Sequence, residues 1–172
     1  MKLKELAKQI AQYVTSWFKK KNKEQEEQDR QQQLTAYNNY AQYMQPEIQS
    51  ALAEVFRQTT ISNHLCPIRT KSDFLLSDYD FVNNNNNFII VYHFSWTKAN
   101  ETAIPTTVLH QMKNRMNQAV YSVQQNYNKV FFTLSDWEKE LFIYNHQVLY
   151  HGFRIIDCKD DEDAVILSVV LN

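Results

Sequence analysis

Two side chains capable of covalent or metal chemistry stand two positions apart, at His64 and Cys66. If this segment is an extended strand, residues i and i+2 lie on the same face, so the imidazole and the thiol would be neighbours. Such a pair can supply two ligands to a metal ion, or a nucleophile and its base. Both functions need a third group at a fixed position, and the sequence specifies none. We therefore expect a structural role for this pair.

The other candidate groups also lack the spacing that known sites require. The remaining histidines, which form no HExxH or similar pattern, are His93, His110, His146 and His151. An acidic cluster lacks the glycine and the terminal glutamate of an EF-hand loop, so we interpret it as a hairpin tip. Its members are Asp157, Asp160, Asp161, Glu162 and Asp163. The single glycine, Gly152, provides no phosphate-binding loop. We expect no enzyme, no cofactor and no metal site.

Charge is divided unevenly along the chain. Residues 1–23 contain seven lysines and one glutamate, a net charge of +6, whereas the remaining 149 residues have a net charge of −7. Affinity for nucleic acids comes mainly from Lys and Arg side chains that neutralise phosphates. The distribution therefore disfavours nucleic-acid binding by the acidic body and leaves the basic N-terminal segment as a candidate for an anionic surface.

The N-terminal segment has the pattern of an amphipathic helix. Six apolar residues recur at steps of three and four, so they share one helix face. These predicted partner-binding residues are Leu3, Leu6, Ile10, Val14, Trp17 and Phe18. Three docking surfaces are possible: a groove on a partner protein, an anionic membrane, or the acidic surface of the chain itself or of a dimer mate. Because the lysines gather at the two ends of the segment, the pattern favours a protein groove.

A second apolar stripe follows a polar linker. Residues 24–33 contain no apolar side chain and are predicted to form a polar helical linker between the helix at 1–23 and a single α+β domain at 34–172. The stripe then resumes, and we predict that it faces the core or mediates self-association in a homodimer. Its residues are Leu34, Tyr37, Met44, Ile48, Leu52 and Val55. Pro46 predicts a kink or a new helix start.

The rest of the chain predicts an α+β fold with a mostly antiparallel sheet, N-terminal helices and one long packed helix at 105–128. Strands are expected weakly at 61–69 and clearly at 73–82 and 88–96, with a loop at the five asparagines 83–87. The second clear strand is apolar on both faces, which predicts cover on both. A terminal hairpin is expected at 150–171. Residues 136–144 fit either a short helix capped by Ser135 and Glu138, or a strand.

A nucleic-acid accessory role is the alternative function. No acidic residue occurs between Glu101 and Asp136, and this interval contains Lys113, Arg115 and Lys129. Amide side chains on the same helix, including Asn117 and Gln124, could contact bases or a polar protein surface. Three cations supply few phosphate contacts, so we rank this function second.

The sequence thus predicts a non-enzymatic adaptor or accessory protein that docks its N-terminal helix on another protein. No apolar run approaches the roughly 18 residues that span a bilayer, and the N-terminus lacks a signal-peptide core. We expect a cytoplasmic protein, with peripheral attachment at the inner membrane face through the N-terminal helix as a third possibility.

Overall fold

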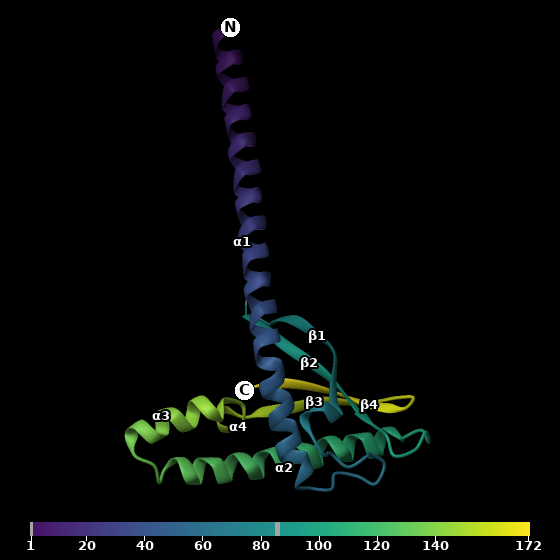
Figure 1. Cartoon of the computed structure of the whole chain (residues 1–172). Helices are drawn as coiled ribbons and strands as arrows, with labels where there is room; N and C mark the ends of the chain where they lie inside the picture. Colours follow the sequence, from purple (N-terminus) through teal and green to yellow (C-terminus); the bar gives the residue numbers. More distant parts are fainter. Residues whose placement is uncertain (1, 85–86) are drawn as a thin grey trace. The chain divides into compact units, whose positions relative to one another are not determined.

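The computed structural model describes residues 2–84 and 87–172. The chain divides into two compact units, Met1–Tyr40 and Ala41–Asn172, which we describe separately. The predicted fold class is confirmed, because an antiparallel sheet is combined with a long N-terminal helix and one long packed helix. Figure 1 shows the order of these elements along the chain.

Helix α1, Lys2–Arg57, begins in the first unit. Residues 2–40 contain no glycine or proline and are rich in Lys, Glu and Gln, which favour helix. The polar stretch at 24–33 is helical throughout, with Gln25 Nε2 donating to Asp29 Oδ1 across one turn at 3.1 Å. Near the start of the helix, Lys21 Nζ lies 4.5 Å from the centre of the Trp17 ring.

The final stretch of α1, residues 41–57, belongs to the second unit. The helix runs through Pro46, so no new helix begins there. One face of this stretch enters the core, and two polar side chains tie it to other elements. Gln49 Nε2 donates to the Phe74 carbonyl at 2.7 Å, and Tyr127 Oη donates to Glu54 Oε1 at 2.5 Å.

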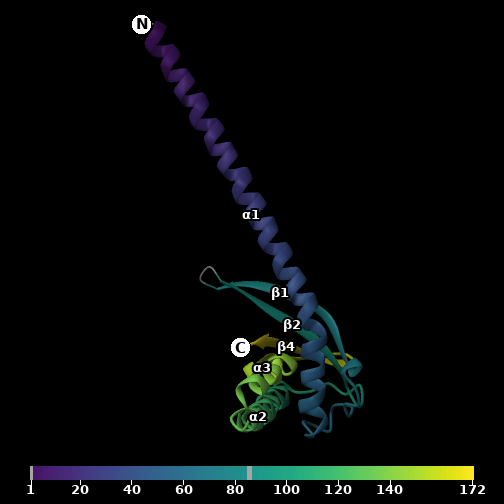
Figure 2. The ribbon, with the colours of Figure 1, turned by 60° about the vertical axis from the view of Figure 1, so that its left-hand side comes forward.

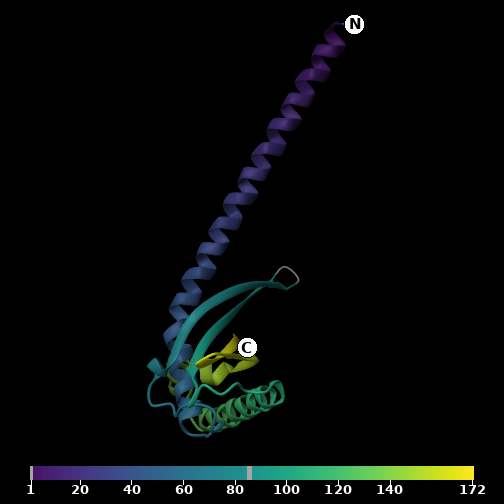
Figure 3. The ribbon, with the colours of Figure 1, turned by 90° about the vertical axis from the view of Figure 1, so that its right-hand side faces the viewer.

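The second unit contains a four-stranded antiparallel sheet of order β1-β2-β4-β3. Its strands are β1 Phe74–Asn84, β2 Asn87–Thr97, β3 Phe153–Asp161 and β4 Ala164–Leu171. The predicted strands and terminal hairpin are thus present, and β1 and β2 bend together as a curved ribbon (Figure 3). The predicted asparagine loop is shorter than expected, because β1 extends through Asn84 and β2 starts at Asn87; residues 85–86 lie outside the described residues.

The prediction of a weak strand at 61–69 is wrong. This segment makes only an isolated bridge, between Leu65 and Lys98. Its backbone bonds to the end of β2 through the Cys66 N–H, which donates to the Thr97 carbonyl at 3.0 Å. Pro67 follows immediately and has no N–H to continue the ladder, so the pairing ends there.

Three helices follow β2 in the chain. They are α2 Thr106–Phe131, α3 Asp136–Asn145 and α4 Gln147–His151; a short 3-10 turn, Lys71–Asp73, precedes β1. Figure 2 views α2 nearly along its axis, with α3 beside it. The long packed helix is confirmed, and of the two alternatives at 136–144 the helix is correct. The predicted capping box is not formed, because the Ser135 side chain accepts no backbone N–H and its hydroxyl instead donates to the Glu138 carboxylate at 2.6 Å.

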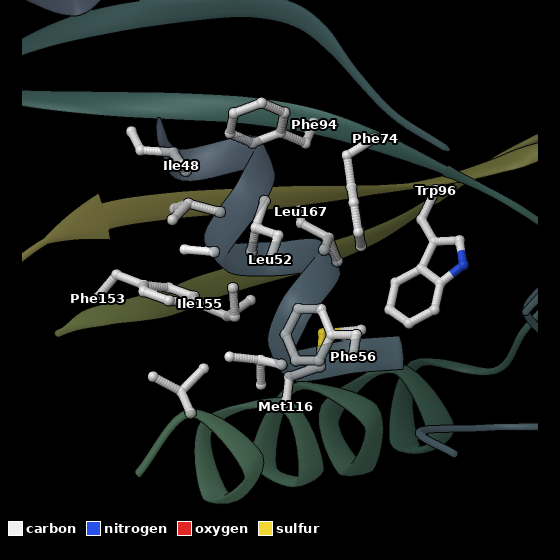
Figure 4. Close-up of a cluster of buried hydrophobic side chains, with 14 of the residues drawn as sticks. Ile48, Leu52, Phe56, Phe74, Phe94, Trp96, Met116, Phe153, Ile155 and Leu167 are labelled. Atoms are coloured by element: carbon white, nitrogen blue, oxygen red, sulfur yellow. The ribbon is translucent and has the colours of Figure 1, made fainter. Parts of the chain in front are cut away.

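The core lies between the sheet and the helices. Figure 4 shows Ile48, Leu52 and Phe56 from α1 among side chains of the strands, with Met116 of α2 on the other side. Phe56 stacks on Trp96 with ring centres 5.5 Å apart. Apolar burial of this extent is the dominant stabilising term for the second unit.

An ion pair between a buried lysine and a partly exposed aspartate joins the residue after β2 to the β3–β4 hairpin. Lys98 Nζ, on a side chain that is only 2% exposed, donates to Asp160 Oδ1 at 2.7 Å and to the Glu162 carbonyl at 2.9 Å. The other carboxylate oxygen of Asp160 accepts from the Ile104 N–H at 3.0 Å. Hydrogen bonds from Lys98 and Ile104 hold the pKa of Asp160 below its usual value. Part of the predicted acidic tip is therefore a structural anchor.

The two faces of the sheet differ. Tyr92, Phe94 and Trp96 point into the core, whereas the alternate residues of β2 point to the opposite, outer face. There Val91 is buried outside the main core cluster, but Ile89 is 37% exposed. The prediction that both faces of this strand are covered is therefore wrong for part of its outer face.

Candidate functional site

The predicted partner-binding residues form an exposed apolar surface on the first unit. We call Leu3, Leu6, Ile10, Val14, Trp17 and Phe18 the arm face. Their exposed fractions range from 42% at Val14 to 82% at Leu3. By the helical period, Lys4 and Lys20 lie on either side of this stripe, and Lys21 lies in line with it at its C-terminal end. The arm face is thus an apolar strip with a cationic border.

The predicted self-association stripe is divided between the two units. Leu34 and Tyr37 belong to the first unit, and the other four residues belong to the second. Met44, Ile48, Leu52 and Val55 are all buried in the core of a single chain. These four side chains are therefore not available as a surface for another copy. The homodimer stays a prediction, and it needs a different surface.

The three cations of the nucleic-acid alternative do not converge on one surface. Lys113 and Arg115 are two positions apart on α2, which places them on nearly opposite sides of the helix. Arg115 donates from its guanidinium to the Ile61 carbonyl at 3.2 Å. Lys129 lies 14 positions beyond Arg115, about 21 Å along the axis at 1.5 Å per residue. The interval without acidic residues therefore does not become a basic patch.

Two of the amides predicted to face outward are bound to backbone instead. Asn117 donates to the Ile155 carbonyl and accepts from the Ile155 N–H, each at 2.9 Å, and so pairs the backbone of one residue on edge strand β3. Gln124 donates to the Tyr150 carbonyl at 3.3 Å beside Gly152, whose φ is +87°. A Cβ at Gly152 would lie 2.7 Å from Gln124 Nε2, the end of a side chain that can move, but the positive φ would strain any residue other than glycine.

A second exposed apolar helix face lies on α3 and was missed by sequence reasoning. We call Trp137, Leu141 and Tyr144 the α3 face; they are 69%, 50% and 70% exposed. Their spacing of i, i+4, i+7 places them on one side of the helix. The spacing is visible in the sequence, but it has this meaning only once the segment is known to be a helix.

Carboxylates border the α3 face. On the helical period, Asp136 and Glu140 lie on one side of the stripe and Glu138 lies on the other. The single cation of the helix, Lys139, is on the opposite side, with its Nζ 5.3 Å from the centre of the Phe131 ring. The α3 face is thus an apolar strip with an anionic border.

A polar row crosses the outer face of the sheet and was also missed. The His93 ring lies between Asp80 and Ser168, with Nε2 2.8 Å from Asp80 Oδ2 and Nδ1 2.9 Å from Ser168 Oγ. These residue types match a hydrolytic triad, which also needs N–H donors for the oxyanion. The backbone of β4 around Ser168 is paired with both β2 and β3, and Ser168 is only 7% exposed. The row is better suited to fix strand register than to attack a substrate.

The structure does not bring His64 and Cys66 together as a reactive pair. Cys66 lines a cavity of about 370 Å³, whereas His64 lines a different one of about 260 Å³. Cys66 Sγ lies 3.4 Å from the Lys98 carbonyl oxygen. The other thiol, Cys158, is buried, and this burial raises its pKa to about 12, which keeps it protonated and unreactive. Within residues 2–84 and 87–172, no three His, Cys, Asp or Glu side chains form a metal-ion site.

No protein-family model, curated protein or solved structure matches this chain. In the part of the chain that the structure describes, no helix has both the length and the apolar composition needed to cross a bilayer.

Proposed function

We propose that the chain is a non-enzymatic adaptor or accessory protein that docks the arm face on a protein partner. One observation carries this proposal: six large apolar side chains in one helical stripe are exposed to solvent. Contiguous apolar surface of this kind is characteristic of interaction sites. The spacing of the arm face, at steps of three and four, is that of helices that bind in apolar grooves.

The distribution of charge favours a protein groove over a membrane. Helices that lie on anionic membranes carry cations along the polar face. Here the middle of the polar face consists of uncharged residues such as Gln9, Gln12 and Ser16, and the lysines stand near the ends. A partner groove with anionic groups at its rim would match both the stripe and the terminal lysines.

The proposal can be tested with two matched variants of the full chain. Ile10→Asp places a charge in the centre of the arm face, and Gln12→Asp places the same charge on the opposite side of the helix. We expect the wild-type chain and Gln12→Asp to retain the same bound proteins in affinity capture, and Ile10→Asp to lose them by tenfold or more. Circular dichroism should show equal helix content in all three.

Two outcomes would overturn the proposal. Capture that is equal for Ile10→Asp and Gln12→Asp would show that the arm face does not bind proteins. Flotation of the full chain with anionic vesicles, without any protein captured, would identify the membrane as the dock. Salt-sensitive retention on DNA that is lost in Lys113→Gln would instead favour the nucleic-acid alternative.

A further inference from the structure

We propose that the α3 face is the docking site for the arm face of a second copy of this chain. This inference rests on the proposed function, since it names the protein on which the arm face docks. The arm face of one copy would bind the α3 face of another, so the interface would be head-to-tail and not symmetric.

The chemistry of the two surfaces is complementary. Both are exposed apolar helix stripes, but the arm face is bordered by lysines and the α3 face by carboxylates. Trp137 and Tyr144 are of the residue types that dominate binding energy in interfaces. Opposite charges at the rims would steer the encounter and fix the orientation of the arm helix. Two copies of the α3 face facing each other would instead bring carboxylates together, which disfavours a symmetric contact.

The position of Lys139 supports the anionic character of this surface. If Lys139 faced the same way as its neighbouring carboxylates, the rim would be mixed in charge. Its ammonium group instead lies over the Phe131 ring at 5.3 Å, on the side of α3 that packs on α2. Asp136, Glu138 and Glu140 are therefore not neutralised by the cation of their own helix.

A head-to-tail interface predicts a specific complementation between variants. Ile10→Asp removes the arm face and keeps the α3 face, whereas Leu141→Asp does the reverse. Each variant alone should be monomeric. When they are mixed in equal amounts, the intact arm face of the Leu141→Asp chain can bind the intact α3 face of the Ile10→Asp chain, and the contact cannot propagate further. The mixture should therefore contain dimers and no larger species.

The experiment is sedimentation equilibrium of the full chains at about 10 to 100 µM, because small interfaces are weak. The wild-type chain should show an average mass above the monomer that rises with concentration and falls when salt is raised to about 0.5 M. Gln12→Asp and Tyr121→Asp are matched controls at exposed positions outside the two faces, and both should assemble as the wild type does. Trp137→Ala is a second α3 variant, and it should weaken assembly at least fivefold without adding a charge.

The outcomes separate this inference from the proposed function. A mixture that stays monomeric, a Leu141→Asp chain that assembles normally, or a monomeric wild-type chain would overturn the inference. If Ile10→Asp loses captured proteins while Leu141→Asp keeps its assembly, the arm face docks elsewhere: the proposed function stands and this inference fails. If Ile10→Asp changes neither assembly nor capture, both fail.

Discussion

The two stretches of helix α1 have the same sequence pattern and opposite environments. Residues 3–18 and residues 41–57 both show apolar side chains at steps of three and four. In the second stretch, Ile48 and Leu52 are fully buried in the core; in the first, Ile10 is 57% exposed. The helical period determines which side chains share a face, but it does not determine what covers that face. Whether an apolar stripe is buried therefore depends on what packs against it, either within the chain or in an assembly.

The largest expected effect comes from placing the same charge in each stretch. Leu52→Asp buries an unpaired carboxylate in the core and should lower the free energy of unfolding by on the order of 5 kcal/mol. Ile10→Asp should change it by less than about 0.5 kcal/mol, because exposed positions tolerate polar residues. Urea unfolding followed by circular dichroism measures both. If both variants lost the same free energy of unfolding, Ile10 would be buried too, and the two stretches of α1 would not differ in environment.

Replacing Pro46, in the second stretch of α1, should raise the free energy of unfolding, whereas Leu52→Asp lowers it. Inside a helix, proline removes one backbone hydrogen bond, here to the Gln42 carbonyl, at a cost of about 3 kcal/mol. Its restriction of the unfolded chain offsets up to about 1 kcal/mol of this. Pro46→Ala should therefore raise the free energy of unfolding by about 2 kcal/mol. Gln42→Ala, an exposed change one turn earlier, should have almost no effect in the same urea titration.

The smallest expected effect concerns the hydrogen bond between Glu54 and Tyr127. Tyr127→Phe removes a bond that ties the final stretch of α1 to α2 and should cost about 1 kcal/mol. Burial, and then the Glu54 carboxylate, raise the pKa of Tyr127 above its usual value of 10.0. The folded state therefore holds this proton more tightly than the unfolded state, so the contribution is complete below pH 10 and is lost as the pH rises further.

Thermal unfolding between pH 8 and about pH 11 tests this contribution, since an unperturbed tyrosine titrates near pH 10. The difference between wild type and Tyr127→Phe should narrow in the upper part of that range. Tyr121→Phe, on the same helix at a 63% exposed position, is the control and should behave as the wild type throughout. A constant difference at all pH values would show that the hydroxyl acts without titrating.

Local patterns predicted α2 and the four strands, left α3 open between helix and strand, and missed the short helix α4. The stripe after Pro105 predicted α2, and the Ser135 and Glu138 pair indicated the start of α3. The strand predicted around Leu65 was wrong because its apolar residues pack on the core while its backbone bonds to the last residue of β2 and to Ala99. Alternation indicates which side chains face inward, but a ladder also needs a partner strand of matching length.

The surfaces could not be predicted in the same way, because they depend on contacts distant in sequence. The row of Asp80, His93 and Ser168 exists only through the registers of three strands. The α3 face required knowing which side of the helix packs on α2. Conversely, the stripe at Met44 to Val55 could be assigned to the core or to self-association from its period, and only the folded chain shows it in the core.

The sheet order has a consequence for synthesis on the ribosome. Strand β4 is made after every other strand, yet it lies inside the sheet between β2 and β3. Its partner β2 is 67 to 77 residues earlier in sequence, from the pair of Thr97 and Ala164 to the pair of Tyr92 and Val169. The sheet therefore cannot form completely until residue 171 has left the exit tunnel. Until then, the edge of β2 that pairs with β4 has no partner strand. Residues 2–40 need no such contact, because their helical hydrogen bonds are all local, so this helix can form before the sheet does.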